Sequence, residues 1–280
     1  MNKLSKAKQA EVVAALVEGN SIRATVRMTG VAKNTIVKLL ANLGRACAEY
    51  QDKTLINLLC KRIQCDEIWS FCYAKEKNVP EDKKGIFGYG DIWTFTAICA
   101  DTKLVPSWHI GRRDLENAAI FMKDLASRLS SRVQLTTDGH RMYVEAVESA
   151  FGSDIDFSQL VKLYGSTIES QKRYSPPQCI GTLKTKINGT PDIQKVSTSY
   201  VERQNLTMRM NMRRFTRLTN AFSKKIENLF YAVSLHFMYY NFCRIHQTLR
   251  VTPAMEAKVT DHAWGLEEVL DLIDSSFVID

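Results

Sequence analysis

The stretch IQCDEIWSF, residues 63–71, predicts a β-strand with an aspartate in its interior. Most of its side chains are β-branched, aromatic or cysteine, which suits a buried, pleated element, and Asp66 stands out among them. Because successive side chains on a strand point to opposite faces, Glu67 is expected to face away from Asp66. The role of this buried acid depends on the elements that surround the strand.

The following elements alternate as a mixed sheet requires. Residues 92–100 and 104–110 predict two strands joined by a tight turn, which makes an antiparallel meander with the first strand. A helix capped by Asp114, a strand at 133–137, a helix at 143–151 and a strand at 159–163 come next. This order predicts an α/β fold with an RNase H-like mixed five-stranded sheet and flanking helices.

The first fifty residues predict a small all-helical helix-turn-helix domain. One helix ends at Gly19-Asn20, Ser21 caps a short second helix, and a third runs from Ala32 to Gly44. A recognition helix reads base edges and phosphates from its exposed N-terminal end. The side chains expected there are those of Lys33, Asn34, Thr35 and Lys38. The alternative interpretation is a helical bundle for dimerisation.

The remaining chain divides into three further segments. Residues 51–62 predict a helical connector, residues 63–220 a catalytic domain, and residues 221–280 C-terminal helices. Residues 165–197 predict an irregular basic insertion in that domain. Helical periodicity predicts two long helices over 199–219 and 221–243.

Positive charge is concentrated in two regions. The net charge of the chain is +8, but residues 170–225 alone hold twelve Lys or Arg against two acids, and residues 1–50 hold eight against three. Two basic regions separated by a more acidic one predict a polyanionic partner held at two places. The seven cysteines include no CxxC pair, and no apolar run could cross a membrane, so we expect a cytoplasmic protein with reduced thiols and no membrane partner.

Three acids lie on three different predicted elements. Asp66 is in the first strand, Asp138 ends the strand at 133–137, and Glu202 begins a basic helix, with gaps of 72 and 64 residues. Carboxylates are the ligands that hard divalent cations prefer, and phosphodiester chemistry uses two such cations. We therefore expect these acids to converge as catalytic metal ligands. An ordinary helix cap is the alternative for Asp138, and Asp91, Asp101 and Asp114 are reserve candidates for Asp66.

The helix that follows Glu202 carries a row of cations. Helical spacing places Asn205, Arg209 and Arg213 on the same face as Glu202. The expected DNA contacts on this segment are Arg203, Asn205, Arg209, Arg213, Arg214 and Arg217, and His140 and His246 are further candidates for the site. A solvated basic helix with an incidental glutamate is the alternative.

Four motifs together resemble one protein family. They are CDEIW, TTDGHRMY, STSYVERQNLTMRMNMRRFTRLTNAFSKK and YYNFCRIHQTLRVTPAME. In this order they look like bacterial insertion-sequence transposases of the DDE type, closest to the IS1 group, over residues 5–260. Two departures are the absence of a cysteine-based zinc element before the helix-turn-helix and the long gap before Glu202.

The resemblance implies a function and a cofactor. Asp66, Asp138 and Glu202 would bind two Mg²⁺ ions, for which Mn²⁺ can substitute. The enzyme would bind the ends of its own insertion sequence, cleave them and join the 3′-hydroxyls to target DNA, as a homodimer or higher oligomer in the bacterial cytoplasm. The alternatives are a DNA-binding regulator or an inactive transposition inhibitor, neither of which needs metal, and a nuclease that cuts without joining.

Overall fold

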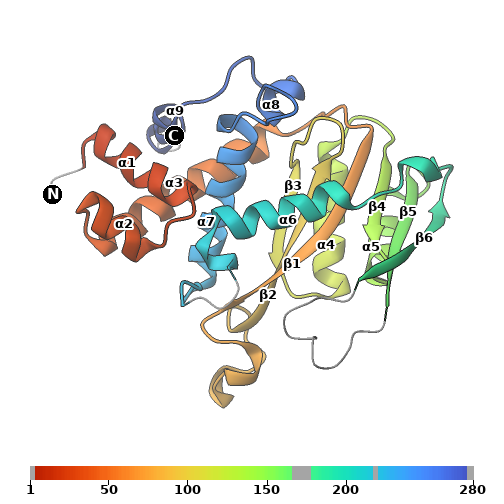
Figure 1. The fold of residues 1–280 in the computed structure, drawn as a ribbon, viewed down its shortest axis with the longest axis horizontal. Helices are drawn as coiled ribbons and strands as arrows, with labels where there is room; N and C mark the ends of the chain where they lie inside the picture. The colour runs from red at the N-terminus through yellow and green to blue at the C-terminus, as the bar shows by residue number, and fades with distance from the viewer. Residues whose placement is uncertain (1–3, 166–177, 217–219, 276–280) are drawn as a thin grey trace.

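The computed structural model describes residues 4–165, 178–216 and 220–275. A six-stranded mixed sheet has helices on both of its faces (Figure 1). The strands are β1 (Arg62–Cys72), β2 (Gly90–Cys99), β3 (Ser107–Gly111), β4 (Gln134–Asp138), β5 (Asp156–Tyr164) and β6 (Cys179–Asn188). The helices are α1 (Lys6–Val17), α2 (Ile22–Thr29), α3 (Lys33–Thr54), α4 (Leu115–Arg128), α5 (Met142–Phe151), α6 (Ser199–Asn211), α7 (Ile226–Met238), α8 (Pro253–Glu256) and α9 (Leu266–Ser275).

The sheet has the strand order β3-β2-β1-β4-β5-β6. Strands β1, β2 and β3 are antiparallel neighbours, whereas β4 runs parallel to β1 and β5 parallel to β4. Each parallel connection passes through a helix, α4 or α5, because parallel neighbours cannot be joined by a tight turn. The first five strands thus occur in the predicted order.

The two faces of β1 are covered by different helices. Cys65 faces the larger core, with Phe95 of β2 and Phe121 of α4. Ile68 faces a second core, with Val201 of α6 and Val233 of α7. Helices α4 and α5 therefore lie behind the sheet in the view of Figure 1, and α6 crosses its front.

The prediction of five strands was wrong, and so was that of an irregular insertion where the structure describes it; residues 166–177 of the predicted insertion at 165–197 lie outside the described residues. Residues 179–188 form β6, which pairs antiparallel with β5 along the sheet edge. Most of its side chains are exposed on both faces, including Ile180, Leu183 and Lys186. A strand of this kind lacks the alternation of apolar and polar residues that reveals half-buried strands, and edge strands commonly carry lysines.

Three predicted helix boundaries were also wrong. Helix α3 does not stop at Gly44 but continues to Thr54, and the predicted helical connector over 51–62 was wrong beyond Thr54, since residues 55–61 are not helical. Gly44 serves packing instead of a helix end, because a Cβ on Gly44 would lie 2.5 Å from Cβ of Tyr231 on α7. Helix α6 ends at Asn211 rather than at 219, and the extended backbone of Met212 turns Met212 and Phe215 into the second core. Helix α7 begins only at residue 226.

The N-terminal helices are packed onto the rest of the molecule. The larger core runs without a break from Val12 and Leu43 to Leu135 and Leu270. The turn between α1 and α2 touches the C-terminal end of α6, where a Cβ on Gly19 would lie 2.8 Å from the carbonyl oxygen of Met210. Among the described helices, none is long and apolar enough to span a bilayer.

Candidate active site

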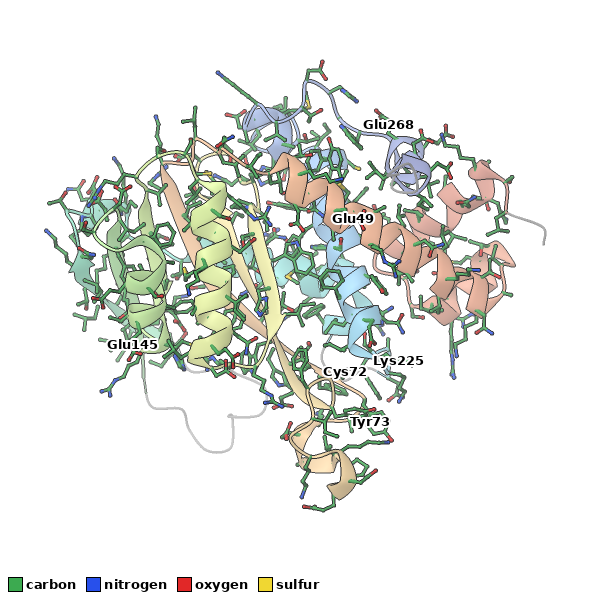
Figure 2. All side chains as sticks on the ribbon, turned by 180° about the vertical axis from the view of Figure 1, so that it is seen from behind. Glu49, Cys72, Tyr73, Glu145, Lys225 and Glu268 are labelled. Carbon is green, nitrogen blue, oxygen red and sulfur yellow. The ribbon has the colours of Figure 1, made fainter. Side chains whose placement is uncertain are left out.

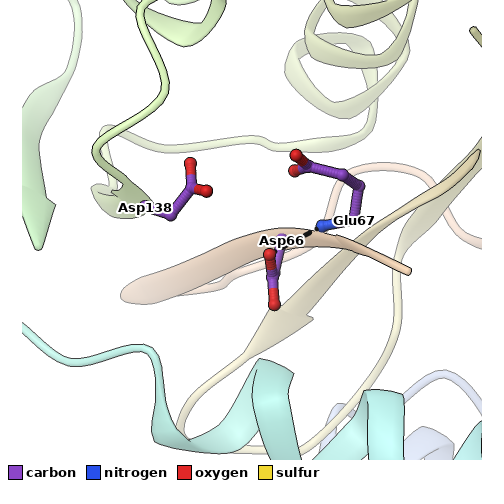
Figure 3. Close-up of side chains that lie close together, drawn as sticks. All are labelled: Asp66, Glu67 and Asp138. Atoms are coloured by element: carbon purple, nitrogen blue, oxygen red, sulfur yellow. Dashed lines mark hydrogen bonds between the residues drawn. The ribbon is translucent and has the colours of Figure 1, made fainter. Parts of the chain in front are cut away.

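Strands β1 and β4 bring two of the predicted acids to the same level of the sheet. They run in parallel with Gln64 opposite Thr136, so Asp66 and Asp138 each lie two residues further along adjacent strands. Carboxylate oxygens of Asp66, Glu67 and Asp138 all lie within 4.8 Å of one another (Figure 3). The described residues contain no other such group of three metal-ligating side chains.

Glu67 is the member of this cluster that the sequence did not predict as a site residue. It points to the opposite side of β1 from Asp66, as the strand geometry predicts, yet its carboxylate still reaches the other two (Figure 3). The side chain is fully buried, accepts a 2.8 Å hydrogen bond from the Tyr143 hydroxyl and pairs with Arg113. These partners lie 76 and 46 residues away in the chain, so no local signal identifies them.

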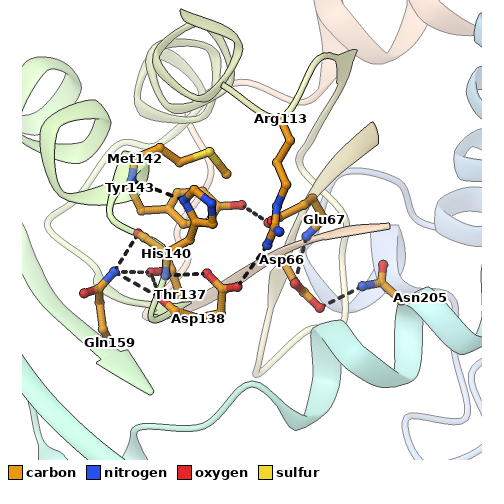
Figure 4. Close-up of polar contacts among 10 residues, drawn as sticks. All are labelled: Asp66, Glu67, Arg113, Thr137, Asp138, His140, Met142, Tyr143, Gln159 and Asn205. Carbon is orange, nitrogen blue, oxygen red and sulfur yellow. Dashed lines mark hydrogen bonds and ion pairs between the residues drawn. The ribbon is translucent and has the colours of Figure 1, made fainter. Parts of the chain in front are cut away.

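Arg113 bridges two acids of the cluster. Besides its contact with Glu67, its Nη2 atom lies 3.7 Å from Oδ2 of Asp138 (Figure 4). Its guanidinium also stacks 4.7 Å from the ring centre of Trp93. This arrangement compensates the charge on the Glu67 side of β1. Asp66, on the other side, has no cation within ion-pair distance among the described residues.

Burial and the crowding of the acids raise the pKa of Asp66. Burial, followed by the charges of Glu67, Asp138 and Glu202, raises the pKa of Asp66 to about 7, while a 2.8 Å hydrogen bond from the Glu67 amide opposes this rise. A bound divalent cation would relieve the same repulsion. Closely spaced carboxylates with an uncompensated member are therefore a suitable donor set for such an ion.

Asn205 lies at the carboxylate cluster and not on an exposed DNA-binding stripe. It is 9% exposed, and its Nδ2 atom donates a 2.9 Å hydrogen bond to Oδ2 of Asp66 (Figure 4). Asn205 lies three residues after Glu202 on α6, as the predicted helix requires, but this face of α6 turns toward β1. Asn205 thus orients Asp66 from the side opposite to Glu67.

Glu202 approaches the cluster from the first turn of α6. Its carboxylate accepts a 2.5 Å hydrogen bond from the Thr198 hydroxyl and pairs with Lys162 of β5. It is not among the three acids within 4.8 Å, although its charge reaches Asp66. In this structure, the lysine therefore holds the third predicted acid beside the cluster.

A buried glutamine fixes the start of α6. Oε1 of Gln64 accepts hydrogen bonds from the backbone amides of Tyr200 (2.8 Å) and Val201 (3.2 Å). Gln64 is 3% exposed and lies two residues before Asp66 on the same face of β1. One strand thus carries the first acid and the cap that positions the helix bearing Glu202, which sequence spacing could not reveal.

The two candidate histidines are in different places. The backbone amide of His140 donates to Oδ1 of Asp138 at 3.1 Å, and Gln159 binds the carbonyl oxygens of both residues (Figure 4). His140 therefore shapes the turn that carries Asp138. The ring of His246 instead contacts the Thr248 hydroxyl, and the charged groups near it are Lys103 and Arg244 and not the carboxylates. Burial, followed by these two cations, lowers the pKa of His246.

The predicted DNA-contacting side chains do not form one stripe. Those at the start of α3 are all exposed: Lys33, Asn34, Thr35 and Lys38. On α6, Arg203 is exposed and Arg209 is half-buried. Arg213 and Arg214 lie in the turn after α6, where Arg214 donates to the Ser223 hydroxyl at 2.6 Å, and Arg217 lies outside the described residues.

The reserve acids have local structural partners. Asp114 accepts the Asn117 amide as the cap of α4, Asp101 pairs with Arg62, and Asp91 accepts the amide of Glu76. Each carboxylate is thereby used in a turn or cap, which leaves Asp66 as the acid of β1 at the cluster.

Comparisons with known proteins give a distant structural similarity only. No protein-family model and no curated protein matches the sequence. A crystal structure of a pre-cleavage Mos1 transpososome aligns with 56% of this chain and 60% of its own, at 9% identity and a TM-score of 0.21. The Mos1 strand transfer complex aligns with 84% of this chain and 76% of its own, at 13% identity and a TM-score of 0.24.

Proposed function

We propose that this chain is a DDE-type transposase that cleaves DNA at the ends of its own mobile element and transfers the freed strands to a target. The observation that carries the proposal is the convergence of Asp66 and Asp138 from adjacent parallel strands, with Glu202 held nearby on α6. The order β3-β2-β1-β4-β5 of the first five strands in the sheet supports the proposal of an RNase H-like core. Assignment to the IS1 group depends on the sequence motifs alone.

The residues of the cluster suit Mg²⁺, with two ions expected. Asp66 and Asp138 would hold metal between them, and Glu202 would complete the set once it leaves Lys162. Such ions activate an attacking oxygen and stabilise a leaving one in phosphodiester chemistry. Glu67 is engaged by Arg113 and Tyr143, so we assign it the role of orienting those groups around Asp138.

DNA recognition belongs to the N-terminal helices in this proposal. The start of α3 exposes Lys33, Asn34, Thr35 and Lys38 together, as a recognition helix would. A regulator that binds DNA through α3 alone is the second candidate, because these four exposed residues would serve it equally. A dimer or higher oligomer would allow two DNA ends to be processed together.

The test uses purified protein, labelled duplex DNA that flanks its own gene, and Mg²⁺ or Mn²⁺. Asp138→Asn and Glu202→Gln should each abolish metal-dependent nicking and joining and preserve DNA binding. Glu145→Gln is the matched control, because Glu145 is an exposed acid on α5 (Figure 2). Binding by the wild type without any cleavage would contradict the enzyme and support the regulator or an inactive inhibitor.

A further inference from the structure

A large basic cleft lies between the N-terminal helices and the segment that joins α6 to α7. Its volume is about 800 Å³, and its described walls come from residues 16–40 on one side and from residues 211–214 and 220–236 on the other. The cations lining it are Arg23, Lys33, Arg213, Arg214, Lys224 and Lys225. No aspartate or glutamate is among the described lining residues.

The charge in this cleft is not compensated within the described chain. Arg23, Lys33, Arg213 and Lys225 are exposed and form no ion pair with described residues. Lys224 stacks over the ring of Phe222, 4.0 Å from its centre. Cations of one sign on a concave surface focus a positive potential, which attracts an anion and holds it.

Two neutral features of the walls also favour an anionic ligand. Helix α3 begins at the cleft with Ala32 as its N-cap, so no side chain accepts the amides of its first turn, which carry partial positive charge. His236 lines the cleft, is 4% exposed, and has no hydrogen-bond partner at Nε2. An acceptor oxygen in the cleft could bind the amides of the first turn of α3, and it would also accept from His236 in the tautomer that carries its hydrogen on Nε2.

The cleft is also fixed in position relative to the carboxylates. Gly19 packs against Met210 and Asn211, so the wall formed by the α1–α2 turn is fastened to the C-terminal end of α6. Glu202 lies near the other end of that helix. Nine residues at the helical rise span about 14 Å, a distance over which one DNA strand passes about four phosphates.

We propose that this cleft binds the sugar–phosphate backbone of the DNA on which the carboxylates act, and that the contact extends from the start of α3 across to Lys224 and Lys225 on the opposite wall. The inference depends on the proposed function only for the identity of the polymer. Lys224 and Lys225 would contribute phosphate contacts that no recognition helix supplies. Lys225 lies at the start of α7, near Cys72 at the end of β1 (Figure 2).

The experiment measures duplex binding in EDTA over a range of salt concentrations. The double variant Lys224→Gln/Lys225→Gln should reduce the slope of log affinity against log salt by about two and weaken binding about tenfold or more. The variant Arg23→Gln, on the opposite wall, should reduce the slope by about one. The control Lys53→Gln/Lys123→Gln removes two exposed lysines elsewhere and should leave the slope unchanged.

The outcomes separate this inference from the proposed function. Thermal melts first establish that each variant is folded. Reduced slopes in the cleft variants support DNA binding in the cleft, even if the wild type cuts no DNA. A wild type that cuts no DNA would contradict only the proposed transposase activity. If folded cleft variants keep the salt slope and affinity of the wild type, the proposal that the cleft binds DNA is overturned, whether or not the wild type cuts DNA.

Discussion

At the scale of single residues, the pKa of Asp66 links the site to stability. The folded protein keeps a proton on Asp66 up to pH about 7, whereas the unfolded chain releases it near pH 3.8. Stability should therefore fall as pH rises from about 4 to about 7, by up to about 4 kcal/mol from this group. Denaturant unfolding in EDTA should show that Asp66→Asn removes most of this dependence, and that Asp82→Asn, an exposed control, does not.

Mg²⁺ should restore part of the stability that is lost when Asp66 ionises. Added at pH 8, it should raise the melting temperature of the wild type more than that of Asp66→Asn, because the ion binds the ionised carboxylate. An equal rise in both proteins would show that Asp66 is not a ligand.

Arg113 carries a second prediction at this scale. Glu67 is fully buried, so Arg113→Met would leave the Glu67 carboxylate with the Tyr143 hydroxyl as its main remaining partner. We expect a loss of about 2 kcal/mol in unfolding free energy, less than for a fully buried pair because Arg113 is one-third exposed. Arg112→Met is the control, since Arg112 contacts a backbone carbonyl at the surface. Equal losses in the two variants would rule out a special role for the Glu67 pair.

At the scale of elements, the capping of α6 by Gln64 should matter for activity more than for folding. Gln64→Met removes the acceptor for two amides and should cost about 1 kcal/mol of stability. It should lower DNA cleavage about tenfold or more, because the start of α6, which carries Glu202, would no longer be fixed against β1. Gln134→Met is the control, since Gln134 binds the backbone of Asp192 instead. Cleavage that falls only as far as in this control would contradict the positioning role.

The packing of α3 on α7 gives a prediction about one glycine. Gly44→Ala would push a methyl group against the backbone of Tyr231 and should destabilise the protein by about 2 kcal/mol or more. Gly181→Ala on β6 should be tolerated, because its Cβ would meet only Leu163, at 3.8 Å. Equal midpoints in urea for both variants would be evidence against the close contact.

The elements also show what the sequence could and could not predict. Strands β1 to β5 were predictable, because β-branched and apolar runs with clear turns mark them. Strand β6 was not, since its exposed edge position removes the alternation. The end of α3 was placed too early, because Gly44 serves a tertiary contact, which looks like a helix stop in sequence. At the site, Asp66 and Asp138 could be predicted, whereas Glu67 and Gln64 depend on contacts far along the chain.

At the scale of the whole molecule, the larger core joins the N-terminal helices to the sheet. We expect the described parts to unfold together, with one calorimetric transition whose enthalpy equals the van't Hoff enthalpy. Two resolved transitions, one of them lost on removal of residues 1–54, would show instead that the N-terminal helices fold independently.

The contact of Gly19 with the end of α6 restricts how the chain can change in evolution. An insertion of one residue between Glu202 and Asn211 would rotate one end of α6 against the other by about 100° and displace it by about 1.5 Å. Glu202 would then point away from the carboxylates on the sheet, or the α1–α2 turn would lose its contact with the end of α6. Substitutions can accumulate on the exposed face of this helix, but its residue count should stay constant among active relatives.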